Sequence, residues 1–210
     1  NYQSIQDPSV TVLMQSSDDP NLHFAVWTTT PWTLLSNVLV CVNPQKTYVT
    51  LQHNDSPQKI IIAKDTLERF EHHEQYSIIE TNLGDKLVGL SYEPLFDHYA
   101  NQRETHDIFK IVSDTYVTTE DGTGLVHQAP AFGEDDLRVA QANNITFHPC
   151  PIDDEGRFTD AIEWVKGLYF KDADKPIIQA LKSKNLLHHH TVLEHSYPFC
   201  PRSDTPLIYK

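Results

Sequence analysis

Two short segments about a hundred residues apart constrain this chain more than any other feature. The first, residues 27–33, reads WTTTPWT, and the second, residues 122–136, reads GTGLVHQAPAFGEDD. The first places a cluster of hydroxyls where an apolar strand turns into a helix, and the second places a glycine turn, a histidine and carboxylates at the start of another helix. Together they predict a pocket for a polar substrate that carries an ammonium group.

The pattern around these segments predicts an α+β domain, a β-barrel-like arrangement of short strands with surrounding helices. The length of 210 residues fits one domain spanning residues 1–210. Helices are expected after Thr30 and at residues 64–71, 133–143 and 172–184. Alternation and β-branched residues predict strands at residues 23–27, 38–42, 47–52, 59–63, 76–80, 107–118, 124–128 and in the tail from residue 186 to 200.

The charge balance limits how this chain can meet nucleic acid. Sixteen Lys and Arg residues face 29 Asp and Glu residues, which gives a net charge of -13. Because binding to a phosphate backbone rests on clustered basic residues, a nucleic acid is expected to be held only by its end, with the main affinity located elsewhere.

Other whole-chain features place the protein in a reducing compartment, which we expect to be the cytoplasm. No apolar run approaches the ~20 residues needed to cross a bilayer, so no membrane partner is expected. The three cysteines have no CxxC spacing and form no disulfide framework. The chain begins without Met and without a signal peptide, and we expect it to be a domain of a larger protein.

The threonine cluster has two interpretations. In the structural one, Thr30 caps a helix that Pro31 begins, while Thr28 and Thr29 complete a strand. In the functional one, the hydroxyls contact substrate or water. A threonine without an activating base or N-terminal amine is a poor nucleophile, so the functional interpretation indicates positioning rather than covalent attack.

The second segment has the same two interpretations. Gly122 and Gly124 permit a tight turn or a close backbone approach. His127 lies on one face of a predicted strand, either as a buried structural histidine or in a pocket wall. Asp136 lies in the first turn of a predicted helix, where the helix dipole stabilises a carboxylate. The same carboxylate would suit an α-ammonium group in a site that excludes water.

No metal or cofactor is expected. Adjacent histidines on a strand point to opposite faces, so His72-His73 and His188-His189-His190 cannot all meet on one ion, and neither group has a metal-binding companion motif. The chain has no GxSxG elbow and no P-loop, and GTGLVH lacks dinucleotide-site spacing. A cysteine hydrolase is disfavoured, because nothing local to Cys150 or Cys200 lowers a thiol pKa.

The order and spacing of three motifs resemble the editing domain of class I isoleucyl-tRNA synthetases, in particular the eukaryotic cytosolic type. These motifs are WTTTPWT followed by an Asn, GTGLVHQAPAFGEDD, and HSYPFC at residues 195–200, and the resemblance covers the chain from about residue 20 to its end. The related valine and leucine enzymes carry Arg-Pro-acid where this chain has Thr30-Pro31-Trp32. In the family, this domain is an insertion in the catalytic Rossmann domain.

The resemblance implies a hydrolase that cleaves the ester joining a wrong amino acid, chiefly valine, to the 3′-terminal adenosine of isoleucine tRNA. Its partners would be that aminoacyl-adenosine end, the valine moiety and the remainder of the parent synthetase. For isoleucyl-tRNA synthetases themselves, one methylene in a hydrophobic pocket is known to contribute only ~1–3 kcal/mol to discrimination, which is why a second, hydrolytic site is needed. Hydrolysis of valyl-adenylate is a second expected activity.

The resemblance also implies roles for individual residues. Asp136 is similar to the aspartate that holds the substrate α-ammonium group. Trp32 and His127 resemble walls that limit the side-chain pocket to valine, and Gly124 is expected among the substrate-binding residues. The hydroxyls that resemble the family's contacts to the aminoacyl group, adenosine and water are those of Thr28, Thr29, Thr30 and Thr33. In the family, water attacks with help from the ribose hydroxyl of the substrate, and no protein nucleophile or metal takes part.

One alternative and one departure accompany this hypothesis. The alternative is a module that binds an aminoacyl end or an amino acid without hydrolysing it, since that would need the same pocket. The departure is Pro201-Arg202 where the family has Trp-Arg after HSYPFC, which puts the packing of the C-terminal segment in question.

Overall fold

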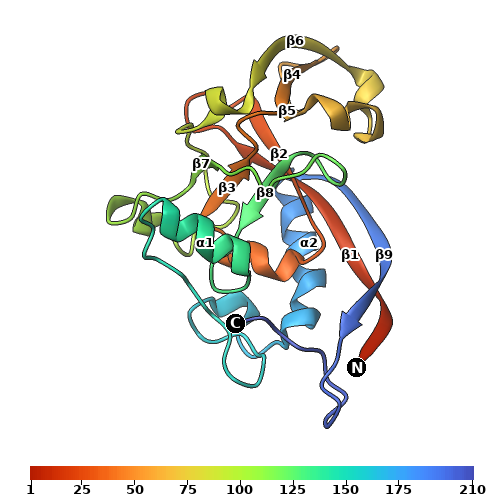
Figure 1. Cartoon of the computed structure of the whole chain (residues 1–210), viewed down its shortest axis with the longest axis vertical. Coiled ribbons are helices and arrows are strands. Elements are labelled where there is room, and N and C mark those ends of the chain that lie inside the picture. Colours follow the sequence, from red (N-terminus) through yellow and green to blue (C-terminus); the bar gives the residue numbers. More distant parts are fainter.

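The computed structural model describes residues 1–210 and contains two β-sheets with short helices along their flanks (Figure 1). The larger sheet has the strand order β6-β4-β5-β2-β1-β9, and all its neighbouring strands are antiparallel except β2 and β5. Its strands are β1 (Tyr2–Gln15), β2 (Leu22–Thr28), β4 (Thr47–His53), β5 (Lys59–Ala63), β6 (Tyr76–Leu83) and β9 (Leu187–Pro198).

A long ribbon of β1 and β9 forms one side of the molecule (Figure 1). The two strands pair from Tyr2 opposite Pro198 to Val12 opposite Leu187. The tail strand was expected from the sequence, but β1 was not. Its buried positions include Asp7, Ser9 and Thr11, and these polar side chains obscure the apolar alternation by which a strand is predicted.

The smaller sheet has the order β7-β3-β8, with β3 (Leu39–Val42) between β7 (Lys110–Ser113) and β8 (Leu125–Gln128). Every residue of β3 is buried, as expected for a continuous apolar run covered on both faces. The strand predicted over residues 107–118 is confirmed only for its four central residues. Phe109 has a φ of 59°, and the Asp114 carboxylate accepts the Tyr116 N–H at 2.9 Å, so a turn bounds the strand on each side.

The two α-helices lie where the sequence predicts them, at Glu134–Ala142 (α1) and Asp174–Ser183 (α2). The helices expected after Thr30 and at residues 64–71 are instead 3₁₀ helices, η1 (Pro31–Ser36) and η2 (Lys64–Arg69). The remaining 3₁₀ turns are η3 (His73–Gln75), η4 (Gly84–Leu87), η5 (Ala100–Glu104), η6 (Glu163–Val165) and η7 (Phe170–Ala173). None of the helices combines the length and apolar composition that a membrane crossing requires.

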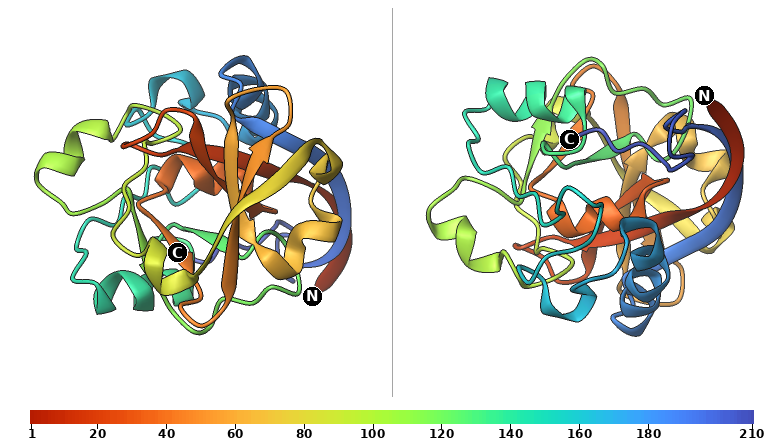
Figure 2. Two further views of the ribbon diagram at one scale, coloured as in Figure 1. Left: turned by 90° about the horizontal axis from the view of Figure 1, so that it is seen from above. Right: turned by 90° about the horizontal axis from the view of Figure 1, so that it is seen from below.

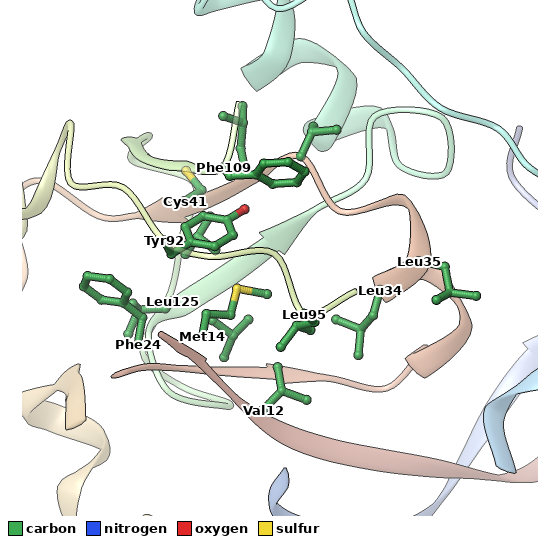
Figure 3. Close-up of a cluster of buried hydrophobic side chains, with 14 of the residues drawn as sticks. Val12, Met14, Phe24, Leu34, Leu35, Cys41, Tyr92, Leu95, Phe109 and Leu125 are labelled. Atoms are coloured by element: carbon green, nitrogen blue, oxygen red, sulfur yellow. The ribbon is translucent and has the colours of Figure 1, made fainter. Parts of the chain in front are cut away.

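One main core joins the two sheets to η1 and α2. It contains 37 buried residues, and Figure 3 shows part of it, with Met14 and Phe24 from the larger sheet facing Cys41 and Leu125 from the smaller one. A second cluster of seven residues packs against η2, around strands β4 and β5. Strands β4, β5 and β6 lie in the foreground of the left view in Figure 2, in which the molecule is seen from above.

The predicted α+β class is confirmed, because mixed sheets and few helices make up the fold. The barrel-like closure is not present. β6 and β9 are the two outer strands of the larger sheet and do not pair with each other, and the smaller sheet has three strands only. A sequence of short alternating segments predicts strands but does not encode whether the outermost two will meet.

Candidate functional site

The two segments that stand out in the sequence line one cavity. Its volume is about 250 Å³, and its walls come from the end of β2, η1, β8, the start of α1 and the C-terminal segment. A larger hollow of about 880 Å³ lies between α2 and the β1–β9 ribbon, but it contains none of the predicted site residues. The smaller cavity is lined by Trp27, Thr28, Thr30, Trp32, Thr33, Val126, His127, Ala129, Phe132, Gly133, Asp136, Tyr197, Ile208 and Tyr209.

Three threonine hydroxyls form a continuous row on one wall of the cavity. The Thr28 and Thr30 hydroxyl oxygens are 3.2 Å apart, and the Thr30 and Thr33 oxygens are 2.9 Å apart. The Thr28 oxygen also accepts the Thr30 N–H at 3.1 Å, and the Thr33 hydroxyl donates to the Thr30 carbonyl at 2.8 Å. The row is therefore fixed by backbone contacts at both ends, and Thr30 in the middle faces the cavity.

The expected capping role of Thr30 is wrong in one respect. Thr30 occupies the N-cap position of η1 and Pro31 begins the helix, as predicted, but no side-chain capping bond is formed. The first free donor, the Trp32 N–H, is bound instead by the Asp174 carboxylate of α2 at 2.9 Å. The sequence gives no local sign of this partner, which lies 142 residues away.

His127 continues the threonine row into the interior. Its Nε2 lies 2.9 Å from the Thr33 hydroxyl, and its Nδ1 lies 2.9 Å from the Asn37 side-chain nitrogen. The same Asn37 nitrogen donates to the Leu39 carbonyl at 2.9 Å, and the Asn37 oxygen accepts the Tyr92 hydroxyl at 2.5 Å. A carbonyl can only accept, so this partner fixes which end of Asn37 carries the N–H groups.

The orientation of Asn37 determines the tautomer of His127. Asn37 donates to Nδ1, so Nδ1 carries no proton, and Nε2 must carry it and donate to the Thr33 oxygen. Burial lowers the pKa of His127 from 6.5 to about 3, so the ring is neutral. His127 therefore cannot take a proton from Thr33 as a general base, and it acts as a donor that orients the threonine row.

The opposite wall carries a single carboxylate. Asp136 lies in the first turn of α1, as predicted, and its Oδ2 accepts the Ala129 N–H at 2.8 Å. It forms no ion pair, and Arg138, two residues further along α1, is bound to Asp114 and Asp135. Burial raises the Asp136 pKa from 3.8 to about 6, with a smaller contribution from the charge of Asp135. A carboxylate in this position lacks a cation, and an ammonium ligand would supply one.

Gly133 allows this carboxylate to fold back toward β8. A Cβ atom at Gly133 would lie 2.8 Å from the Asp136 carboxyl carbon, which is closer than real Cβ contacts come. Since Asp136 bonds to Ala129 across this position, a larger residue at Gly133 would displace it. The glycine of the AFGEDD motif is therefore explained by a close approach of the side chain rather than by its backbone angles.

Trp32 lies in the cavity wall, but mainly as a core residue. It is 5% exposed and contacts Phe132 and Phe170 edge-on, with ring centroids 5.0 Å and 4.8 Å away. Aromatic pairs in this arrangement contribute about 0.5–1.5 kcal/mol beyond the area they bury. Trp32 and Phe132 thus form a rigid apolar floor beside the threonine row, which suits a small aliphatic group.

Two predicted site residues do not line the cavity, Gly124 and Thr29. Gly124 has a φ of 80°, and a Cβ there would lie 2.4 Å from the Ala63 Cβ. Its carbonyl accepts the Tyr48 hydroxyl at 2.6 Å. This glycine is therefore explained by the packing of β8 against β5, and the structure gives it no contact with the cavity.

The structure also brings in residues whose role is not apparent from the sequence. Asn37 belongs to the first motif and Tyr92 lies outside all three motifs, and together the two residues orient His127. Tyr197, Ile208 and Tyr209 enter the cavity wall from the C-terminal segment. The HSYPFC motif contains Tyr197, so the resemblance marked the region, but only the fold shows that it reaches the cavity.

The histidine groups lie elsewhere on the molecule. His188 stacks on Phe70 with ring centroids 4.4 Å apart, and His189 lies 3.6 Å from the Glu71 carboxylate. No group of three or more His, Cys, Asp or Glu side chains is placed to hold a metal ion.

Curated relatives match the whole of this chain. It is 44% identical over 211 residues to an isoleucine–tRNA ligase of Protochlamydia amoebophila, and 44% identical over 215 residues to the cytoplasmic isoleucine–tRNA ligase of Mus musculus. All of this chain is covered, but only 20% and 17% of these relatives, so the chain spans about one fifth of their length. The two identities are equal and do not favour the eukaryotic type. A search of family models found no match.

Solved structures with a similar fold are editing domains of another synthetase. The P. knowlesi cytosolic leucyl-tRNA synthetase editing domain has a TM-score of 0.66 at 11% identity, with 88% of this chain and 96% of that chain covered. The structure described as GlLeuRS-CP1 has a TM-score of 0.64 at 13% identity, with 91% of this chain and 99% of that chain covered. At these identities the likeness shows the fold, which is that of an editing domain.

Proposed function

Since this chain belongs to the isoleucyl-tRNA synthetase family and has the fold of an editing domain, we propose that it hydrolyses the ester of valyl-tRNA(Ile) and spares isoleucyl-tRNA(Ile). Proofreading in general is the role of such domains in class I synthetases. The observation that carries the finer proposal is that an unpaired carboxylate, Asp136, and a row of threonine hydroxyls line one cavity. We also propose that residues 1–210 act as one domain within a cytoplasmic synthetase.

Asp136 would hold the substrate through its α-ammonium group. The carboxylate has one backbone hydrogen bond and no cationic partner. An ammonium group within a few ångströms would form an ion pair that is strengthened by the partial exclusion of water. It would also stabilise the ionised carboxylate and lower the raised pKa of Asp136. Binding at this point fixes one end of the aminoacyl group.

The row of threonines would then lie along the ester. Thr30 is central in the row and lines the cavity, where its oxygen, although bonded to Thr28 and Thr33, keeps a lone pair that can accept a hydrogen bond from a water molecule. His127 orients the row from behind by donating to Thr33. Because the histidine is neutral and its Nε2 carries a proton, the row contains no base that could turn a threonine into a nucleophile.

The attacking group would therefore be water. In the family this site resembles, the ribose hydroxyl of the substrate assists that attack. The protein would contribute orientation, hydrogen bonds toward the developing oxyanion and a pocket of limited size. Trp32, Phe132 and His127 bound the space beside the threonine row. This wall would have to exclude isoleucine, which is larger than valine by one methylene. The proposed partners are the terminal aminoacyl-adenosine and the parent synthetase.

Hydrolysis of valyl-tRNA(Ile) and isoleucyl-tRNA(Ile) by this chain tests the proposal. We expect selective loss of the valyl ester, and we expect the Asp136→Ala variant to lose that activity while the matched variant Asp135→Ala, at an exposed neighbour, keeps it. Binding of a non-hydrolysable valyl-adenosine without turnover, both in this chain and in the full-length synthetase, would favour the alternative of a binding module. Equal hydrolysis of both esters would contradict the proposed selectivity.

A further inference from the structure

The N-terminus of η1 is capped from a distant part of the chain. In a 3₁₀ helix that begins at Pro31, Pro31 has no N–H, and the Thr33 N–H already bonds to the Thr30 carbonyl at 3.0 Å. The Trp32 N–H is the donor that remains free, and a threonine at the preceding N-cap position commonly accepts such a donor through its hydroxyl. Here the Asp174 carboxylate accepts it at 2.9 Å.

This arrangement keeps the Thr30 hydroxyl within the threonine row. Its oxygen lies 3.2 Å from that of Thr28 and 2.9 Å from that of Thr33, and it lines the cavity. If the Thr30 oxygen accepted the Trp32 N–H, it would turn toward the axis of η1 and leave the middle of the threonine row. The position of the Thr30 hydroxyl in the row therefore depends on Asp174 accepting the Trp32 N–H.

Packing holds Asp174 in this place. It is the first residue of α2 and 7% exposed, and Ile177 and Leu181 on the same helix are fully buried. Phe170, just before α2, lies edge-on against the Trp32 ring at 4.8 Å. Asp174 thus meets the backbone of Trp32 while Phe170 meets its side chain, and α2 and η1 are joined at two points.

We infer that Asp174 is a positioning residue for the proposed hydrolysis: it caps the Trp32 N–H in place of Thr30, and so keeps the Thr30 hydroxyl directed at the ester. This inference rests on the proposed function. It assigns a role to a residue that lies 142 positions from Trp32 in the sequence and outside the lining of the cavity.

The substitution Asp174→Ala removes the acceptor of the Trp32 N–H, which can then donate to the Thr30 hydroxyl oxygen instead. We expect kcat for valyl-tRNA(Ile) to fall by about 100-fold, the loss that a misplacement of about 1 Å can cause, with KM changed less than about threefold because Asp136 still holds the ammonium group. Asp174→Asn should keep kcat within about threefold, since its amide oxygen accepts the same bond. Asp172→Ala, at an exposed neighbour, is the matched control.

A double-mutant cycle with Thr30→Val distinguishes positioning from general support of the fold. If Asp174 acts through Thr30, Asp174→Ala causes no further loss of kcat in the Thr30→Val background. Losses that multiply would overturn the inference, as would equal losses in the Asn and Ala variants. If Asp174→Ala does not fold, Asp174→Ser replaces it as the test variant. Serine is favourable at the start of a helix, but its side chain is too short for its oxygen to reach the Trp32 N–H.

The outcomes also separate this inference from the proposed function. Hydrolysis by the unsubstituted chain or by the full-length synthetase, with kcat unchanged in Asp174→Ala, would overturn the role of Asp174 alone. An absence of hydrolysis in both proteins would overturn the proposed function and this inference with it.

Discussion

The two walls of the cavity satisfy their polar groups in opposite ways. On the threonine side, hydrogen bonds run from Thr28 through Thr30, Thr33 and His127 to Asn37, and every member has a partner within the protein. On the other side, Asp136 has one backbone donor and no cation. A wall that is satisfied internally can orient a ligand without changing, whereas a wall with an unpaired, partly buried carboxylate favours a cation. The difference suggests that one wall positions and the other binds.

The largest effect on activity is expected for the substitution Asp136→Asn in the carboxylate wall. An amide has nearly the same shape but cannot pair with an ammonium group, and a buried charge that loses its partner costs about 3–5 kcal/mol. At about 1.4 kcal/mol per factor of ten, we expect kcat/KM for valyl-tRNA(Ile) to fall by about two to three and a half orders of magnitude. A loss below tenfold in a deacylation assay would mean that Asp136 is not the anchor.

The same substitution should stabilise the free domain. Burial raises the Asp136 pKa from 3.8 to about 6, so the folded state binds more protons than the unfolded state between these values. Its stability therefore falls as the pH rises from about 4 through 6. We expect Asp136→Asn to raise the free energy of unfolding by up to about 3 kcal/mol at pH 8, measured by urea denaturation, and by almost nothing near pH 4. Equal effects at both pH values would contradict the raised pKa.

Removing a hydrogen bond from the threonine wall should lower both the stability of the domain and its activity. Thr33→Val removes the oxygen that accepts the His127 Nε2–H, and a buried donor left without a partner costs about 1–3 kcal/mol. We expect a lower unfolding midpoint and a kcat reduced by about tenfold, with KM nearly unchanged. A rise in KM without loss of kcat would show that this wall binds rather than positions.

The pH dependence of binding should reflect the carboxylate wall alone. Asp136 must be ionised to hold an ammonium group, so KM is expected to rise as the pH falls below about 6, whereas neutral His127, with a pKa of about 3, adds no titration in that range. Deacylation measured from pH 5 to 8 checks this. In Asp136→Asn the rise in KM should disappear, and its persistence would assign the titration to another group.

The smallest effect is expected for Tyr92→Phe. The Tyr92 hydroxyl helps to fix Asn37, two steps from the threonine row, and the Leu39 carbonyl fixes Asn37 as well. A typical hydrogen bond contributes about 0.5–1.5 kcal/mol, so we expect a loss of kcat of only a few-fold. A loss as large as that of Thr33→Val would show that the tautomer of His127 depends chiefly on Tyr92.

Much of the fold could be predicted from local patterns. The strands predicted at residues 47–52 and 59–63 are confirmed as β4 and β5, which pair antiparallel, and the carboxylates after Gly133 predicted the start of α1. β1 could not be predicted in this way, because Asp7, Ser9 and Thr11 are buried by partners from distant parts of the chain, including Lys171 beside Asp7.

The same distinction between local pattern and distant partners applies to the candidate site. By itself, the sequence determined which chemical groups are present, since the hydroxyls, the imidazole and the carboxylate lie in two short motifs whose order and spacing resemble one family. Only the tertiary structure decided which of these groups face the cavity and which partners they have. It excluded Gly124 and Thr29 from the lining, fixed the tautomer of His127 through Asn37, and supplied the cap of η1 from Asp174. The reason is physical: a hydrogen bond or a buried charge depends on neighbours in space, and here those neighbours lie up to 142 residues away.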